Sequence, residues 1–161
     1  MAPAALRCSA PPAGAVLKLV GESGPHFGGS LWAEHRSAAG AIVRGEVPPP
    51  IDDPLTRYEA VHQAIVSGAV LAAHDCSEGG LAVTLAEMAI AGRVGIDVAG
   101  EATAAWLFGE SNGRIVLAVD PSRVDDAPGV VIGATDDSGR FRLGAAGIDL
   151  AVSELVAAWK G

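Results

Sequence analysis

Aromatic residues and basic charge are both scarce in this sequence. Aromatic side chains make up 4% of the 161 residues, and lysine occurs only at Lys18 and Lys160. The 19 acidic residues outnumber the 11 basic ones, which gives a formal net charge of −8. Nucleic-acid-binding domains carry a basic patch or stripe. This composition therefore argues against a nucleic acid as partner.

Cysteine is scarce as well, and its two occurrences stand in unlike surroundings. Cys8 lies in the proline-rich N-terminal stretch and Cys76 in a polar cluster in mid-chain. Two cysteines make a weak case for a disulfide framework, which in small secreted domains uses more of them at regular spacing. We therefore expect two reduced thiols and a cytoplasmic protein.

Long apolar runs are missing. No run approaches the roughly 18 residues that a membrane-spanning helix needs, and the first residues, MAPAALRCSAPPAGA, lack the apolar core of a signal peptide. The four histidines show no ligand spacing, whereas a zinc site requires three or four converging ligands. The sequence therefore predicts neither membrane association nor a metal site, and it contains no P-loop pattern.

The length predicts one domain with a substantial core, because a chain of this size buries roughly 68–70% of its unfolded surface. Residues 1–14, rich in proline, are expected to form a linker or N-terminal arm, and residues 15–161 the domain. The first predicted elements are a strand over 15–20, a glycine-rich loop over 21–30 and a short helix starting at 31–35. Asp53-Pro54 predicts the start of a second helix and Gly68 its end. Its expected core-facing stripe comprises Leu55, Tyr58, Val61 or His62, and Ile65.

The second half of the chain continues with alternating strands and helices. Strands are expected over 94–98 and 114–120, a short helix over 101–107 and a helical turn over 121–126. Residues 130–134 and 139–143 are predicted to pair as strands around a turn at 136–139. A helix over 148–159 is expected to close the chain.

Residues 69–88 carry the most informative pattern. The apolar run 69–73 indicates a buried strand, the polar cluster 74–78 and Gly79-Gly80 follow, and Leu81, Leu85 and Met88 mark one face of a helix. Asp75 or Ser77 is expected to cap this helix, with Glu78 completing a capping box. Free N–H groups at a helix start attract anions, so Gly79 and Gly80 are candidates for binding phosphate.

Two strings, HDCSEGGLAVTLAEMAIAG and LFGESNGRIVLAV, resemble the C-terminal domain of the phosphoribosylformylglycinamidine synthases, in the AIR synthase-related superfamily. Gly28-Gly29-Ser30 and residues 51–59 fit the same pattern, and the resemblance runs from about residue 15 to 159. Three departures stand out: Cys76 replaces an aliphatic residue, Asn112 replaces glutamine, and His26-Phe27 replaces Glu-Leu. The role of Gly28-Gly29-Ser30 is left open by the last of these.

The resemblance implies an α/β (α+β) fold with a mixed β-sheet flanked by helices. It also implies a ligase that converts formylglycinamide ribonucleotide to its amidine with ATP, Mg²⁺ and glutamine, held mainly by domains absent from this chain. The implied partners are those remaining domains, a glutaminase subunit and a small PurS-type subunit. The isolated chain is then expected to be inactive and to form a homodimer. A non-catalytic interaction module of the same fold is the alternative, and a domain of another superfamily enzyme fits the string LFGESNGR less well.

The resemblance also assigns candidate site residues. Glu110, Ser111 and Asn112 match a stretch that contacts the ribonucleotide in the first of the synthase's two C-terminal domains. In this domain they are either substrate contacts or a structural loop of satisfied polar groups, and the latter is favoured. Arg114 is a candidate to complete an anion-binding corner with the two glycines, although strand alternation could turn it away. The remaining polar cluster is interpreted as hydrogen-bonded structure at a domain interface: His74, Asp75, Ser77. No catalytic residue is assigned.

Overall fold

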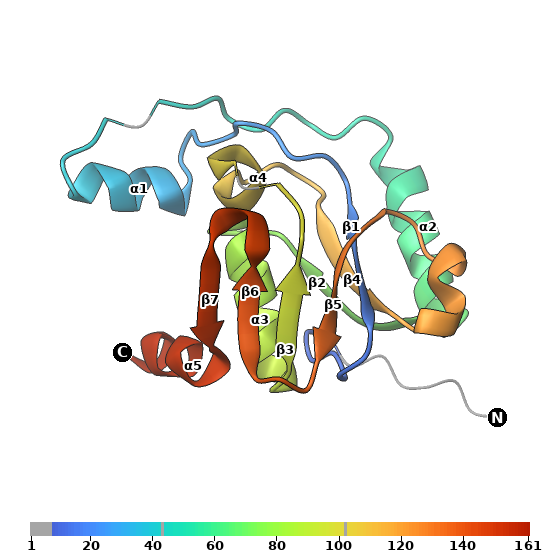
Figure 1. Ribbon diagram of the computed structural model, residues 1–161. Helices are drawn as coiled ribbons and strands as arrows, with labels where there is room; N and C mark the ends of the chain where they lie inside the picture. The colour runs from blue at the N-terminus through green and yellow to red at the C-terminus, as the bar shows by residue number, and fades with distance from the viewer. Residues whose placement is uncertain (1–7, 43, 102) are drawn as a thin grey trace.

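The computed structural model describes residues 8–42, 44–101 and 103–161, which form a mixed sheet with helices on both faces (Figure 1). The seven strands lie in the order β2-β4-β1-β5-β3-β6-β7, and every pairing is antiparallel except the parallel pair β3–β6. Their bounds are β1 Val16–Val20, β2 Val70–Asp75, β3 Gly95–Val98, β4 Ile115–Val119, β5 Val130–Asp136, β6 Arg140–Leu143 and β7 Ile148–Ala151. The expected mixed β-sheet flanked by helices is thus confirmed.

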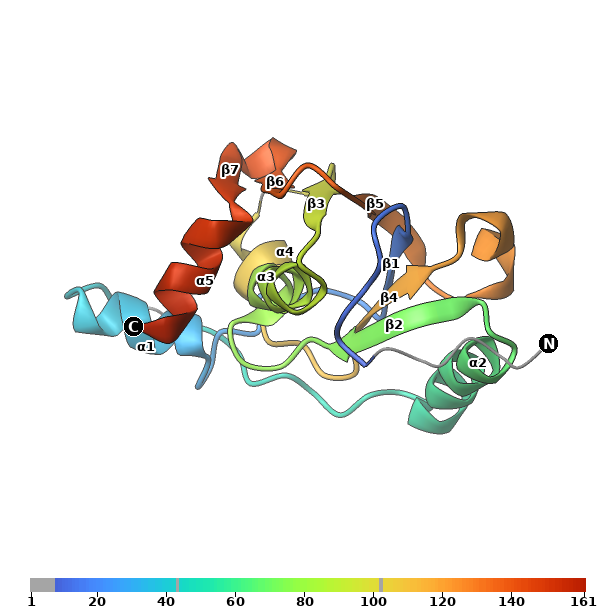
Figure 2. The same cartoon turned by 90° about the horizontal axis from the view of Figure 1, so that it is seen from below.

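The helices divide between the two faces of the sheet. The sheet bends around α3, and α2 lies on the opposite side of β2 (Figure 2). The helical bounds are α1 Leu31–Ala38, α2 Pro54–Val66, α3 Gly80–Gly92, α4 Ala104–Phe108 and α5 Val152–Lys160, with short 3₁₀ turns η1 Pro121–Asp126 and η2 Gly144–Ala146. In the described part of the chain, no helix combines the length and apolarity needed to cross a bilayer.

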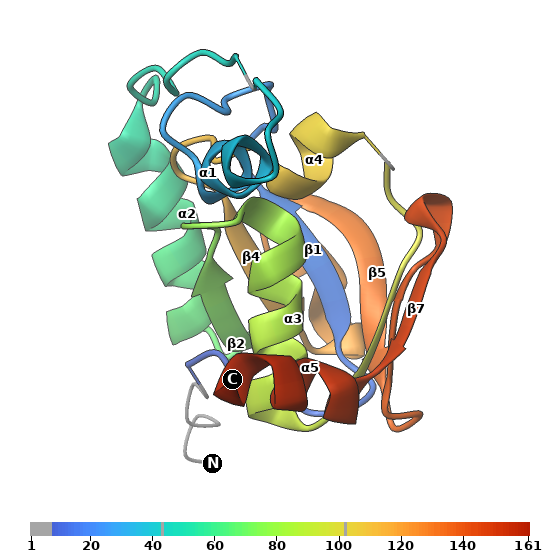
Figure 3. The ribbon, with the colours of Figure 1, turned by 90° about the vertical axis from the view of Figure 1, so that its left-hand side faces the viewer.

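Helix α3 forms the centre of the larger core. Leu81, Leu85 and Met88 are fully buried, as the sequence spacing predicts. They pack with residues of β1, β3, β4 and β6, and α5 crosses the lower end of the helix (Figure 3). A smaller core lies between α2 and the other face of β2 and β4. A helix this apolar is stable only when it is covered on most sides, which the curved sheet and α5 provide.

The predicted core-facing stripe of α2 is wrong in part. The helix begins as expected, with Asp53 as N-cap and Pro54 in its first turn, but Val61 and Ala64 face the core while Leu55 and Tyr58 are 79% and 43% exposed. The helix carries two apolar stripes on adjacent faces. Periodicity alone does not show which of them the sheet covers.

The predicted pairing of the strands over 130–134 and 139–143 is also wrong, although both strands exist. Strand β3 lies between them, antiparallel to β5 and parallel to β6. The chain does turn after Asp136, whose carboxylate accepts the N–H of Ser138 at 2.8 Å. A turn signal shows where a chain reverses, but it does not show that a distant strand enters between the two arms.

The closing helix starts later than predicted. Residues Ile148–Ala151 form the edge strand β7, which pairs with β6, and α5 begins at Val152. Arg140 and Asp149 form an ion pair across the two strands at 2.8 Å. Because Ile148 and Leu150 are compatible with either structure, the pairing with β6 decides the conformation of this segment.

The described part of the N-terminal arm, residues 8–14, is bound to the sheet. The carbonyl of Cys8 accepts the N–H of Ala73 at 2.8 Å, and the hydroxyl of Thr135 donates to the carbonyl of Pro12 at 2.7 Å. Pro11 is fully buried. The rest of the arm, residues 1–7, lies outside the described residues.

Lys18 of β1 links the sheet to the 3₁₀ turn η1, and this contact can be tested by its effect on stability. Its ammonium group is buried at 7% exposure and donates to the carbonyls of Val124 and Ala127 beside η1. Because Lys18→Met leaves both carbonyls without this donor, we expect urea denaturation to show a loss of about 1–3 kcal/mol in the free energy of unfolding. Lys160→Met, which changes the exposed lysine of α5, is the matched control and should cost less than about 0.5 kcal/mol. Equal stability of the two variants would contradict this role.

Candidate functional site

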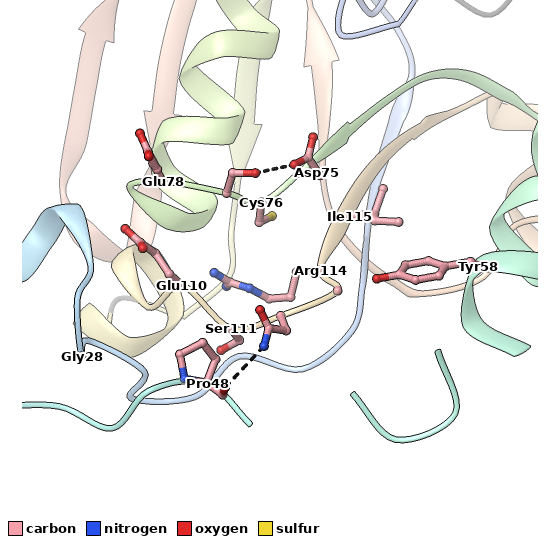
Figure 4. A pocket seen from close by; sticks show the side chains of 13 residues that line it. Gly28, Pro48, Tyr58, Asp75, Cys76, Glu78, Glu110, Ser111, Arg114 and Ile115 are labelled. Atoms are coloured by element: carbon pink, nitrogen blue, oxygen red, sulfur yellow. Dashed lines mark hydrogen bonds between the residues drawn. The ribbon is translucent and has the colours of Figure 1, made fainter. Parts of the chain in front are cut away.

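A cavity of about 450 Å³ opens where β2 ends, α3 begins and the loop 109–113 passes in front of β4 (Figure 4). Tyr58 of α2 and Pro48 of the segment before α2 form its outer edge. Its charged lining consists of three carboxylates and one guanidinium: Asp75, Glu78, Glu110 and Arg114. The cavity therefore carries an acidic lining with one buried cation, and the predicted polar residues of both loops do meet in it.

Glu110 joins two helix starts. Its Oε1 atom accepts the N–H of Gly79, the residue before α3, and the N–H of Leu31, the first residue of α1, each at 2.8 Å. A carboxylate at a helix N-terminus is stabilised by the partial positive charge there. Glu110 therefore occupies the position where an external anion was expected.

Gly80 lets the start of α3 approach the loop 109–113 closely. Gly79 and Gly80 have φ values of +79° and +69°, and a Cβ atom on Gly80 would lie 2.7 Å from the carbonyl oxygen of Gly109. Their N–H groups are already engaged, since Gly80 donates to the carbonyl of Ser77 and Gly79 donates to Glu110. An anion at these nitrogens would have to compete with groups of the chain itself.

The predicted cap of α3 is wrong. Gly79 is the N-cap and makes no side-chain capping bond. Asp75 instead accepts the hydroxyl of Ser77, and this bond lowers the pKa of Asp75 below its ordinary value. The acceptor at the helix start comes from Glu110, 31 residues further along the chain.

Arg114 is directed into the protein. It is 1% exposed, and its guanidinium donates to the hydroxyl of Ser23 at 2.8 Å and to the carbonyls of Trp106 and Gly109. Burial lowers the pKa of Arg114, and nearby Cys76 and Glu110 partly offset this. The guanidinium thus ties the first glycine-rich loop to α4 and its C-terminal loop.

Ser111 and Asn112 hold two further segments. Ser111 Oγ accepts the N–H of Gly24 at 2.9 Å and is hydrogen-bonded to His26 Nδ1 at 2.8 Å. Asn112 donates to the carbonyl of Pro49 at 3.0 Å. His26 departs from the family's sequence pattern, and its partner in this loop is Ser111. All three polar side chains of residues 110–112 are bonded within the molecule.

The polar cluster at the end of β2 gains a partner that the sequence did not suggest. His74 Nε2 lies 3.0 Å from Glu87 of α3, and its Nδ1 lies 3.4 Å from Asp75. Ser77 bonds to Asp75 rather than to His74. The sequence could not reveal this contact, because it depends on how α3 lies against β2.

Cys76 lines the same cavity but is 8% exposed, and burial raises the pKa of its thiol. Cys8 is exposed. Because thiolates are the reactive species, we expect a thiol reagent such as dithionitrobenzoate to label Cys8 rapidly at pH 8, and Cys76 only after denaturation. Mass spectrometry of labelled peptides measures this. Equal labelling rates in the native protein would contradict the buried position of Cys76.

Known proteins resemble this chain in sequence over most of its length. Residues 12–136 match the family described as "AIR synthase related protein, C-terminal domain". PurL, a phosphoribosylformylglycinamidine synthase subunit, from Corynebacterium aurimucosum is 38% identical over 89% of this chain and 21% of its own length. That of Moorella thermoacetica is 44% identical over 70% of this chain and 15% of its own length. The chain thus spans about a fifth of the first of these relatives.

Solved structures share the fold at low identity. Thermotoga maritima PurL complexed with FGAR has a TM-score of 0.72 and 19% identity, over 93% of this chain and 29% of that one. A hydrogenase maturation protein, HypE, in complex with ATP has a TM-score of 0.55 and 17% identity, over 83% of this chain and 48% of that one. The family match covers most of the described sheet. The chain therefore belongs to the family of AIR synthase related C-terminal domains.

Proposed function

We propose that this chain is the C-terminal domain of a phosphoribosylformylglycinamidine synthase and forms one wall of a site that other domains complete. The observation that carries the proposal is the 38% identity with the Corynebacterium aurimucosum PurL over 89% of this chain. The complete enzyme would be the ATP-dependent ligase that converts formylglycinamide ribonucleotide to the amidine, with glutamine as amide donor.

The cavity favours a role as one part of a shared binding site over a role as an independent binding site. Glu110, Ser111 and Asn112 each bond to other parts of the chain. One helix end contributes about 0.3–1 kcal/mol to anion binding, whereas even millimolar affinity requires about −4 kcal/mol. In this proposal the loop 109–113 shapes the wall, and ribose hydroxyl or amide groups of the ligand meet its remaining acceptors.

The residues present do not fit ATP with Mg²⁺. The three carboxylates of the lining repel a triphosphate. The N–H groups of Arg114 already donate hydrogen bonds to oxygens within the protein. Within residues 8–42, 44–101 and 103–161, no group of three or more His, Cys, Asp or Glu side chains could hold a metal ion. The acidic lining supports our proposal that ATP, with its Mg²⁺, binds in the other domains of the synthase.

The partners follow from the same proposal. A Thermotoga maritima structure named PurLQS resembles this fold with a TM-score of 0.68, and its name supports further synthase subunits as partners. We propose that these are a glutaminase subunit and a small PurS-type subunit, and that the enzyme is cytoplasmic. The homodimer of the isolated chain stays a prediction, because exposed apolar side chains favour association. Sedimentation showing only monomer at high concentration would count against it.

A non-catalytic interaction module is the second candidate. It is favoured by the internal bonding of residues 110–112, which serves the fold whether or not a ligand is present. In the first candidate the chain is needed for amidine formation, whereas in the second it only binds to the rest of the synthase.

We expect the purified chain alone to show no ATP hydrolysis and no amidine formation, since it lacks the ATP-holding domains. Addition of the remaining domains of a PurL relative should restore amidine formation from formylglycinamide ribonucleotide, measured by a coupled assay. Those domains without this chain are the control and should stay at background.

Two results would contradict the proposal. ATP turnover by the isolated chain, above that of a mock purification, would overturn the division of roles. Binding to the remaining domains without any gain in amidine formation would favour the interaction module.

A further inference from the structure

Helix α2 exposes a second apolar stripe that the described residues of the chain leave uncovered. Leu55, Tyr58, His62 and Val66 follow the spacing of one helix face. Leu55, Tyr58 and Val66 are 79%, 43% and 60% exposed, and His62 is exposed as well. The adjacent face of α2, with Val61 and Ala64, already packs on the sheet. A continuous apolar patch on a surface helix marks an interaction site.

The stripe is continuous with the cavity. Tyr58 belongs to both, and Figure 4 shows its ring extending from α2 toward Arg114 and Ile115. Arg57 ties the same helix to the loop 109–113 by donating to the carbonyl of Gly113 at 3.3 Å. A surface that covered the stripe would therefore also reach the open side of the cavity.

Charge around the stripe restricts what can cover it. Asp52, Asp53 and Glu59 are exposed at its N-terminal end, and the guanidinium of Arg57 is turned to Gly113. An acidic rim favours a partner with lysine or arginine around an apolar patch. A second copy matches this rim less well than a basic partner does, because each copy carries a net charge of −8.

We propose that Leu55, Tyr58 and Val66 dock another domain of the synthase, one that presents an apolar patch with a basic rim and closes the open side of the cavity. This rests on the proposed function. The stripe supplies the contact, and the domain that binds it supplies the second wall.

The test measures binding of the full chain to Corynebacterium aurimucosum PurL from which the matching fifth has been removed. Val66→Glu and Leu55→Glu should each weaken the affinity at least 10-fold in calorimetry. The matched control is Val130→Glu, a valine of β5 with 65% exposure against 60% for Val66, and it should change the affinity less than 2-fold. Affinity should also fall as salt rises, because the rim contacts are charged. Thermal melts of all variants should match the wild type, since the changed side chains are exposed.

Each other outcome overturns the proposal. Binding that tolerates Val66→Glu and Leu55→Glu, while the mixture makes amidine, removes the docking surface and leaves the proposed function intact. An equal loss with Val130→Glu shows that any added charge interferes and removes the stripe as the site. Self-association abolished by Val66→Glu would make a second copy the occupant. A wild-type chain that neither binds nor restores activity overturns the proposed function and this inference together.

Discussion

Arg114→Met is expected to lower the free energy of unfolding by about 3 kcal/mol. The buried guanidinium donates to Ser23 and to the carbonyls of Trp106 and Gly109, and methionine leaves those acceptors without it. Each unsatisfied buried acceptor costs about 1–3 kcal/mol, and the relief from burying a charge offsets part of this. Urea denaturation measures the loss.

Two further variants sharpen the interpretation. Arg114→Lys keeps the charge but lacks the planar fork, so it should recover only part of the stability. Arg123→Met removes a half-exposed ion pair with Asp126 and an exposed hydrogen bond to the carbonyl of Ser67, and it should cost less than about 1 kcal/mol because both lie in solvent. Unchanged stability of Arg114→Met would show that the guanidinium does not hold these loops together.

Glu110→Ala is expected to cost about 2–3 kcal/mol, because two backbone N–H groups lose a charged acceptor. Glu110→Gln keeps an oxygen at that position and should cost less. Hydrogen exchange gives the specific readout, since the amides of Gly79 and Leu31 should exchange faster in the alanine variant. If those two amides kept their protection, the carboxylate would not be their acceptor.

Individual helices and strands could be predicted from the sequence, because the order of neighbouring residues determines them. The buried face of α3, the Asp53-Pro54 start of α2 and the strands flanking the cavity all follow from short-range pattern. The position of β3 between β5 and β6 could not be predicted, because no short-range pattern encodes a neighbour strand whose paired residues lie 35 to 45 positions away. The two stripes of α2 were ambiguous for a similar reason, since the sheet chooses between them.

The site shows the same division. The strings shared with the synthases suggested that Gly79, Gly80 and the loop 109–113 lie together. In the structure Gly80 lies against the carbonyl of Gly109, and Gly79 donates to Glu110. It could not show that Glu110 fills the helix start, because that bond joins residues 31 positions apart. The partnership of His26 with Ser111 spans 85 positions and was equally hidden.

Calorimetric titration of the isolated chain with ATP and with inorganic phosphate tests the central claim, that this cavity is one wall of a shared site. An acidic lining whose donors are engaged internally should give no measurable binding of either ligand at millimolar concentration. Micromolar binding of either one to the chain alone would contradict the claim.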